Sequence, residues 1–240
     1  MPASAISTDL NLNLEFEISV SGLLFDMDGV LVRSTQGDER CWTRWAAQYG
    51  LSDTFDLRRT HGRRAVDTIR EYLPGLTDEA VAEHLSRLDA LSEEEQEIVI
   101  AYPGVVELLA SIPSYRWTIV TSASEKLMRS RLSAAGIVAP RHTVGGDTIS
   151  MGKPHPEGYL RGATILTRRP EECLVIEDAP AGIRAGKAAG CQVLAIASSH
   201  HPSELHEADW IVGAIDQLDV SIDAGTAALN LKFPAIQRSS

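Results

Sequence analysis

The chain has 240 residues, enough for one large domain or for a core with a smaller insert. Its 22 basic and 33 acidic residues give a net charge of −11, which argues against a nucleic-acid binder because such proteins normally present a basic face. No apolar run approaches the roughly 18 residues of a membrane span. We expect no signal peptide, because the N-terminus lacks a basic segment followed by an apolar core. The three cysteines lack metal-ligand spacing, so we expect reduced thiols in a cytoplasmic protein that binds neither nucleic acid nor membrane.

Two strands are predicted near the N-terminus. Apolar and polar residues alternate from Leu12 to Val20, a pattern typical of a strand with one buried face at a sheet edge. The next segment, Gly22 to Phe25, is short and mostly apolar, which favours a fully buried strand. Asp26, Asp28 and Gly29 follow this strand. Chains usually turn at such a glycine, and ligands of open parallel sheets bind at the carboxyl ends of the strands.

The sequence pattern of residues 34–101 differs from that of the preceding strands and is typical of helices. Trp42, Trp45 and Tyr49 have helical spacing, and Gly50 is a plausible helix end. Further helices are predicted at 64–73, 77–91 and 92–100, and no strand is expected in this region. We therefore predict that residues 34–101 form a helical domain inserted into a catalytic core made of residues 1–33 and 102–240.

The remainder alternates between strands and helices. Strands are predicted at 116–120, 173–176, 192–197 and 210–212, with a short one near Val144. Helices are predicted at 105–110, 125–135, 157–166 and 180–189. This alternation indicates βαβ units and an α/β fold with a mostly parallel sheet. The tail after about Ser221 has only a weak pattern, so we expect it to be partly mobile.

Polar side chains gather at the predicted strand ends and loops. They are Asp26 and Asp28, then Thr121, Ser122 and Ser124, then Lys153, and finally Glu177 and Asp178. Each group alone fits a helix cap or a solvated turn, but the carboxyl ends of parallel strands meet at one edge of a sheet. Carboxylates can hold Mg²⁺, while hydroxyls, helix amides and a lysine can bind phosphate oxygens. The set therefore predicts phosphoryl transfer, in which a carboxylate can be the nucleophile.

Four segments resemble the motifs of the haloacid-dehalogenase superfamily of phosphohydrolases, over about Gly22 to Trp210. They are Phe25-Asp26-Met27-Asp28-Gly29-Val30-Leu31, Val120-Thr121-Ser122-Ala123-Ser124, Gly152-Lys153-Pro154 with Pro156-Glu157, and Ile176-Glu177-Asp178-Ala179 with Ala181-Gly182-Ile183. The resemblance implies a Rossmann-like core with an inserted α-helical cap, and Mg²⁺ as cofactor.

The resemblance also implies roles for single residues. Asp26 would be the nucleophile, and Asp28 the general acid and then the general base. Mg²⁺ would be bound by Asp26, the Asp28 carbonyl and Asp178, with Glu177 close by. The transferring phosphoryl group would be bound by Ser122, the Ala123 amide and Lys153.

The segment Thr60-His61-Gly62-Arg63-Arg64 resembles the cap loop of the sugar-phosphatase and glycerol-phosphatase branch. This likeness implies a small phosphorylated sugar or polyol as substrate, with His61, Arg63 or Arg64 pointing toward the cleft; a basic surface loop is the alternative. Two positions depart from the family pattern. Arg33 stands where relatives usually carry an acid, and Asp38 stands where the phosphomutase branch commonly has a histidine.

Several functions compete at this point. The sequence favours a Mg²⁺-dependent phosphatase that works through an aspartyl-phosphate, and the alternative is a β-phosphoglucomutase-like hexose phosphomutase of the same fold. A phospho-accepting receiver domain is much shorter and lacks a helical insert. A binding-only relative is disfavoured because every catalytic position is filled, and a dehalogenase would not need the metal-binding acids. We expect a monomer, because no exposed apolar helix is evident.

Overall fold

The computed structural model describes residues 14–95 and 99–236. At its centre lies a five-stranded parallel sheet in the order β5-β2-β6-β7-β8. The strands are β5 (Trp117–Ile119), β2 (Gly22–Phe25), β6 (Cys173–Glu177), β7 (Gln192–Ile196) and β8 (Trp210–Val212). The predicted α/β class with a parallel sheet is thereby confirmed, and the strand that precedes Asp26 lies in the sheet interior between β5 and β6.

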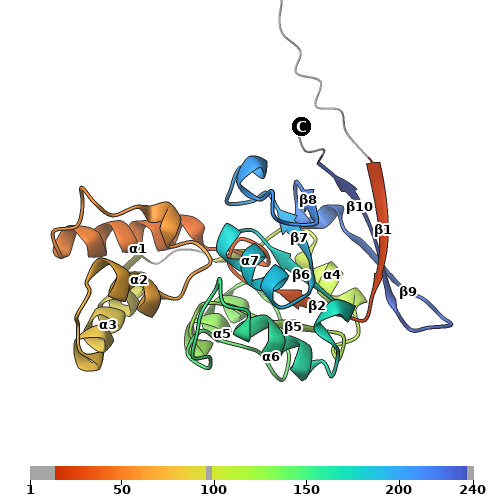
Figure 1. The fold of residues 1–240 in the computed structure, drawn as a ribbon, viewed down its shortest axis with the longest axis horizontal. Coiled ribbons are helices and arrows are strands. Elements are labelled where there is room, and N and C mark those ends of the chain that lie inside the picture. Colours follow the sequence, from red (N-terminus) through yellow and green to blue (C-terminus); the bar gives the residue numbers. More distant parts are fainter. Residues whose placement is uncertain (1–13, 96–98, 237–240) are drawn as a thin grey trace, which may run out of the picture.

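Helices cover both faces of this sheet (Figure 1). They are α4 (Val105–Ser111), α5 (Glu125–Ala134), α6 (Glu157–Ile165) and α7 (Pro180–Ala188). Side chains alternate along β2, so Leu23 and Phe25 join the apolar cluster of α4 and α5, while Leu24 joins that of α6 and α7. Burying each of these side chains stabilises the fold by about 1.5–3 kcal/mol.

A second, antiparallel sheet joins the two ends of the described chain. Its order is β1 (Leu14–Val20), β10 (Leu229–Ala235) and β9 (Asp219–Ile222). The predicted edge strand is confirmed from Leu14 onward, whereas Leu12 lies outside the described residues. The tail after Ser221, for which the sequence showed only a weak pattern, contains β10: alternate residues from Leu229 to Ala235 are buried in the core, and the strand pairs with β1.

Residues 35–95 form α1 (Thr35–Gln48), α2 (Ala65–Tyr72) and α3 (Asp78–Glu95), on the opposite side of the molecule from β1 and β9 (Figure 1). They bury an apolar cluster of their own around Trp45. Two predictions are corrected here. One helix, α3, continues through residues assigned to two helices, and β4 (Ile100–Ala101) pairs with β3 (Val32–Arg33), where no strand was expected. The division of the chain at 34–101 stays a prediction.

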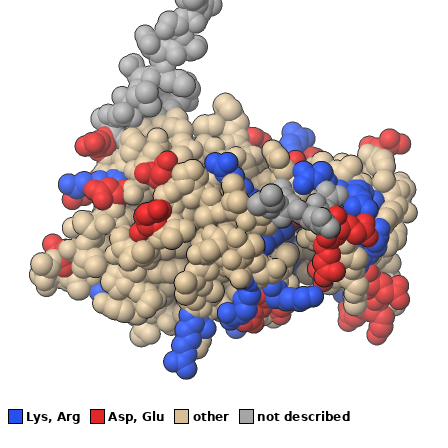
Figure 2. All heavy atoms as spheres, turned by 180° about the vertical axis from the view of Figure 1, so that it is seen from behind, with Lys and Arg blue, Asp and Glu red and all other residues tan. Residues whose placement is uncertain are grey.

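The remaining elements are short. The strand expected at Val144 is reduced to a single bridge with Val120, and 3₁₀ turns occur at Leu57–Arg59, Pro170–Glu172, Pro202–Glu204 and Ile215–Gln217. None of the helices in residues 14–95 and 99–236 is long and apolar enough to cross a membrane. On the face drawn in Figure 2, basic and acidic side chains are interspersed, so the residues described there form no continuous basic surface.

Candidate active site

Three predicted acids meet at the ends of neighbouring strands. Asp26 follows β2, Glu177 is the last residue of β6, and Asp178 comes next. One carboxylate oxygen of each lies within 4.8 Å of the others, and all three residues are buried. The parallel register of β2 and β6 explains this meeting, because it brings both strand ends to one edge of the sheet.

Lys153 joins the acids from the loop before α6. Its Nζ donates to Asp26 Oδ1 at 2.5 Å and to Glu177 Oε1 at 2.6 Å. Tyr159, on α6, donates its hydroxyl to the same Glu177 oxygen at 2.7 Å. The second oxygen of Glu177 accepts the backbone N–H groups of Asp178 and Ala179. Glu177 is thus held by four donors and in turn fixes the lysine beside Asp26.

Burial dominates the electrostatics of this cluster. It raises the pKa of Asp26 to about 7, although Lys153 acts in the opposite direction. Burial, followed by the charges of Glu177 and Asp26, raises the pKa of Asp178 well above its ordinary range. For Lys153, burial alone would lower the pKa, but Asp26 and Glu177 outweigh burial and raise it. The lysine therefore stays charged, whereas the carboxylates need a further positive charge to be fully ionised.

The acid cluster fits a hard divalent cation. Three carboxylates face one ammonium group, so full ionisation leaves an excess of negative charge in a buried place. The donors are oxygens, which Mg²⁺ prefers. The backbone at Gly29 passes so close to Asp178 that no side chain fits there. Gly29 has φ +82°, and a Cβ at this position would lie 1.9 Å from Asp178 Oδ2. Ser199, which sequence reasoning missed, donates its hydroxyl to that same oxygen.

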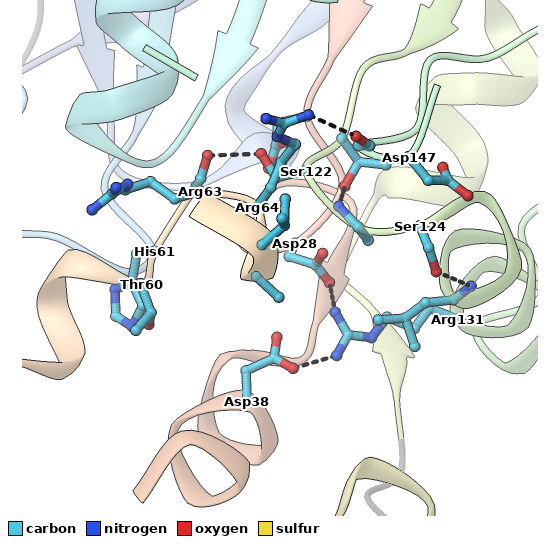
Figure 3. A pocket seen from close by; sticks show the side chains of 18 of the residues that line it. Asp28, Asp38, Thr60, His61, Arg63, Arg64, Ser122, Ser124, Arg131 and Asp147 are labelled. Carbon is cyan, nitrogen blue, oxygen red and sulfur yellow. Dashed lines mark hydrogen bonds and ion pairs between the residues drawn. The ribbon is translucent and has the colours of Figure 1, made fainter. Parts of the chain in front are cut away.

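Asp28 has a different environment from Asp26. Its Oδ1 accepts the Ser34 hydroxyl at 2.5 Å and Arg131 Nη1 at 2.6 Å. Arg131, on α5, also pairs with Asp38 on α1 (Figure 3). Neither Ser34 nor Arg131 was singled out from the sequence, because a serine near a turn and one of several basic residues on a helix carry no local signal.

The residues predicted to bind the phosphoryl group lie beside these acids. Ser122 Oγ donates to the Gly62 carbonyl at 2.8 Å, and the Ala123 N–H donates to Thr121 Oγ1 at 3.1 Å. Ser124 accepts the Leu127 N–H and so caps α5. The structure therefore brings Ser122 into the site but uses its hydroxyl to contact the segment before α2.

The loop Thr60–Arg64 places its three candidate residues differently. Arg64 is largely buried; it forms a two-pronged ion pair with Asp67 and donates to the carbonyls of residues 146, 149 and 150. Arg63 pairs with Glu71 and points away from Asp28 and Ser122 (Figure 3).

His61 is the third candidate on this loop. Its Nε2 lies 3.3 Å from Glu39 Oε1, but the angles are not those of a hydrogen bond. Within the described residues, neither ring nitrogen has a hydrogen-bond partner. The ring meets His200 edge-on, with the ring centroids 5.3 Å apart. His61 thus lines the cavity, while its two ring nitrogens are buried and make no hydrogen bond among the described residues.

A cavity of about 410 Å³ unites these groups. Its walls include Asp26, Asp28 and Asp178 from the strand ends, and His61 and Arg64 from the loop before α2. Apolar side chains from both the helical region and α5 complete the walls, namely Trp42, Val66, Leu85 and Leu127. A polar floor with partly apolar walls suits a small hydroxylated molecule that carries one strongly anionic group.

The fold and the acid cluster define a class of hydrolase, and the comparisons give the same class. Residues 20–190 match the family of haloacid dehalogenase-like hydrolases, so the chain belongs to this family. It is 38% identical over 205 residues to hexitol phosphatase A of Escherichia coli (strain K12), covering 83% of this chain and 94% of that protein.

Two further matches extend the picture. The chain is 31% identical over 225 residues to 2-deoxyglucose-6-phosphate phosphatase 1 of Saccharomyces cerevisiae, covering 85% of this chain and 92% of the relative. The crystal structure of a β-phosphoglucomutase from Clostridium difficile superposes with a TM-score of 0.70 at 22% identity, covering 83% and 93% of the two chains. This last likeness shows the fold alone.

Proposed function

We propose that this protein is a Mg²⁺-dependent phosphatase for a small sugar or polyol phosphate. The observation that carries the proposal is the cluster of Asp26, Lys153, Glu177 and Asp178 at adjacent strand ends, part of which opens on a cavity of about 410 Å³. The names of the two curated relatives, a hexitol phosphatase and a 2-deoxyglucose-6-phosphate phosphatase, support the substrate class.

In the proposed reaction, a carboxylate oxygen of Asp26 attacks phosphorus and forms an aspartyl-phosphate. Asp28 gives a proton to the leaving alcohol and then takes a proton from the water that hydrolyses the intermediate. Lys153 neutralises charge on the phosphoryl oxygens, and Glu177 holds the lysine in place through the 2.6 Å contact. All of these residues lie at, or contact, the carboxyl ends of β2 and β6.

We propose that Asp26, Asp178 and the Asp28 carbonyl hold the cation, with Glu177 close by. Bound Mg²⁺ supplies charge neutralisation and orientation for the phosphoryl group. Ser199 supports this assignment, because its hydroxyl orients Asp178. Ser122 and the Ala123 amide would bind the remaining phosphoryl oxygens once Ser122 exchanges the Gly62 carbonyl for substrate.

We further propose that residues 34–101 are the cap domain and choose the substrate. The separate apolar cluster around Trp45 supports a unit of its own. In this assignment His61, which lines the cavity, contacts the sugar or polyol, while Arg64 docks the cap on the core loop at 146–150 and Arg63 has the least direct role. We place the enzyme in the cytoplasm as a monomer that binds neither nucleic acid nor membrane. The net charge of −11 supports the absence of a nucleic-acid partner.

Phosphate release from a panel of hexitol, hexose and glycerol phosphates, with and without Mg²⁺, tests the proposal. We expect metal-dependent release that the variant Asp26→Asn abolishes. The matched control Asp53→Asn, at an exposed turn, should keep full activity. Release that survives Asp26→Asn refutes the mechanism, and an isomerised sugar phosphate with little free phosphate indicates the phosphomutase instead.

A further inference from the structure

Arg131 lies between two carboxylates that come from different parts of the chain. It belongs to α5, and only 7% of the residue is exposed. Nη1 donates to Asp28 Oδ1 at 2.6 Å, and Nη2 donates to the carboxylate of Asp38 on α1. Figure 3 shows the guanidinium group spanning the gap between these two acids. The roles proposed above make no use of this contact.

The contact fixes one oxygen of Asp28. Ser34 donates its hydroxyl to the same Oδ1, at 2.5 Å, so that this atom is held by two donors. In Figure 3 the other carboxylate oxygen points toward the side where Ser122 lies, which is the predicted phosphoryl position. A carboxylate with one oxygen held from two directions has little rotational freedom, and its second oxygen is aimed before substrate arrives.

Asp38 completes the arrangement. A single carboxylate would leave the buried guanidinium held at one end only, whereas Asp38 holds the opposite nitrogen. Burial alone would lower the pKa of Arg131, but the charges of Asp28 and Asp38 outweigh burial and raise it, so the group stays cationic. The planar fork of an arginine presents a separate nitrogen to each of the two acids, whereas a lysine has one nitrogen on which both acids would have to converge.

We infer that Arg131 is a positioning residue that aims Asp28 at the leaving-group oxygen, with Asp38 as its counter-carboxylate. The inference rests on the proposed function, because it concerns proton transfer to a leaving alcohol. The inference also gives Asp38 a role, because the Asp38 carboxylate holds Arg131, which in turn holds Asp28.

The dependence on the leaving group tests this role. A polyol phosphate needs a proton on its departing alcohol, whereas p-nitrophenyl phosphate releases a stable phenolate that needs none. For Arg131→Met we expect the first-turnover rate to fall by about 10²-fold with the polyol phosphate. Release of nitrophenolate in the first turnover should stay close to that of the unmodified protein. Arg131→Lys should restore little, since it lacks the pair of nitrogens that contacts Asp28 and Asp38 separately.

Arg129→Met is the matched control, because Arg129 lies on the same helix, is exposed and pairs with Glu125. It should leave both substrates unaffected. Asp38→Asn provides a second route that keeps Arg131 and its contact with Asp28. We expect a smaller loss, about tenfold, again confined to the polyol phosphate. If Arg131→Met does not fold, Asp38→Asn decides.

Three results overturn the inference: an equal loss with both substrates, no loss with either, or a change in KM alone. The first indicates a general structural role, and the last indicates direct substrate binding. The proposed function fails in a different way, namely when the unmodified protein releases no phosphate or when Asp26→Asn remains active.

Discussion

The strand-end acids and the loop Thr60–Arg64 border the same cavity but are built in different ways. Asp26, Glu177 and Asp178 are fixed by the register of two parallel strands. The side chains that donate hydrogen bonds to them all lie outside the helical region, namely Lys153, Tyr159 and Ser199. The loop before α2 is positioned by a few side-chain contacts, chiefly those that Arg64 makes with carbonyls of the core. The comparison teaches that the acids are fixed by the sheet itself, and under the proposed function substrate choice would depend on how the helical region docks.

The largest effect should come from the core side of this comparison. Lys153→Met removes the cation that contacts Asp26 at 2.5 Å and leaves two buried carboxylates without their partner. We expect kcat to fall by about 10³-fold for every substrate of the panel, because the lost charge stabilises the phosphoryl group itself. The control Lys187→Met removes an exposed lysine from α7 and should leave kcat unchanged. A loss confined to some substrates contradicts the assignment.

This contrast explains what the sequence could predict. Asp26, Asp28 and Asp178 follow strands whose apolar patterns are readable, so their position at one sheet edge was predictable. Lys153 lies in a loop and was assigned through the motif that it resembles. Tyr159, Ser199 and Arg131 reach the site from helices and a distant turn, and no local pattern marks them. Their positions depend on tertiary packing.

The missed β10 has another cause. Leu229, Leu231 and Phe233 do alternate with polar residues, but the run follows a weakly patterned segment and includes Pro234. Its partner β1 lies at the other end of the chain, and so the pairing that stabilises it has no local signature. Likewise, β4 has two residues and exists because it pairs with β3.

A smaller effect is expected from the cap side. Arg64→Met removes the contacts with the loop at 146–150, and hydrogen bonds to charged groups contribute about 1.5–3 kcal/mol each. We expect KM to rise about tenfold, which corresponds to about 1.4 kcal/mol, with a changed ranking of substrates. Steady-state kinetics on the panel measure both quantities. Arg70→Met, at an exposed ion pair on α2, the helix that follows Arg64, serves as control. An unchanged KM in Arg64→Met would show that the docking contacts of Arg64 do not affect substrate choice.

The smallest effect concerns pH and Mg²⁺. Because the pKa of Asp26 is raised from 3.8 to about 7 in the folded protein, the folded state retains a proton that the unfolded chain releases. Without added Mg²⁺, the free energy of unfolding should therefore fall as the pH rises from about 4 to about 7. The cation must displace this proton, so Mg²⁺ should raise Tm more at pH 8 than at pH 5.5.

Thermal unfolding of the unmodified protein and of Asp178→Asn measures this difference. The variant lacks a proposed ligand and should show little response to Mg²⁺ at either pH. An equal rise in Tm in both proteins would place the cation elsewhere on the molecule. The same measurement distinguishes the strand-end acids from the loop Thr60–Arg64, because Arg64→Met should show the same rise in Tm with Mg²⁺ as the unmodified protein.

Covalent trapping of the phosphoryl group tests the central claim most directly. Asp28→Asn should still accept a phosphoryl group from p-nitrophenyl phosphate but should hydrolyse the intermediate slowly, because the general base is missing. Mass spectrometry of the acid-quenched protein is then expected to locate one phosphoryl group on Asp26. A phosphoryl group on another residue, or turnover with no covalent intermediate, contradicts the account.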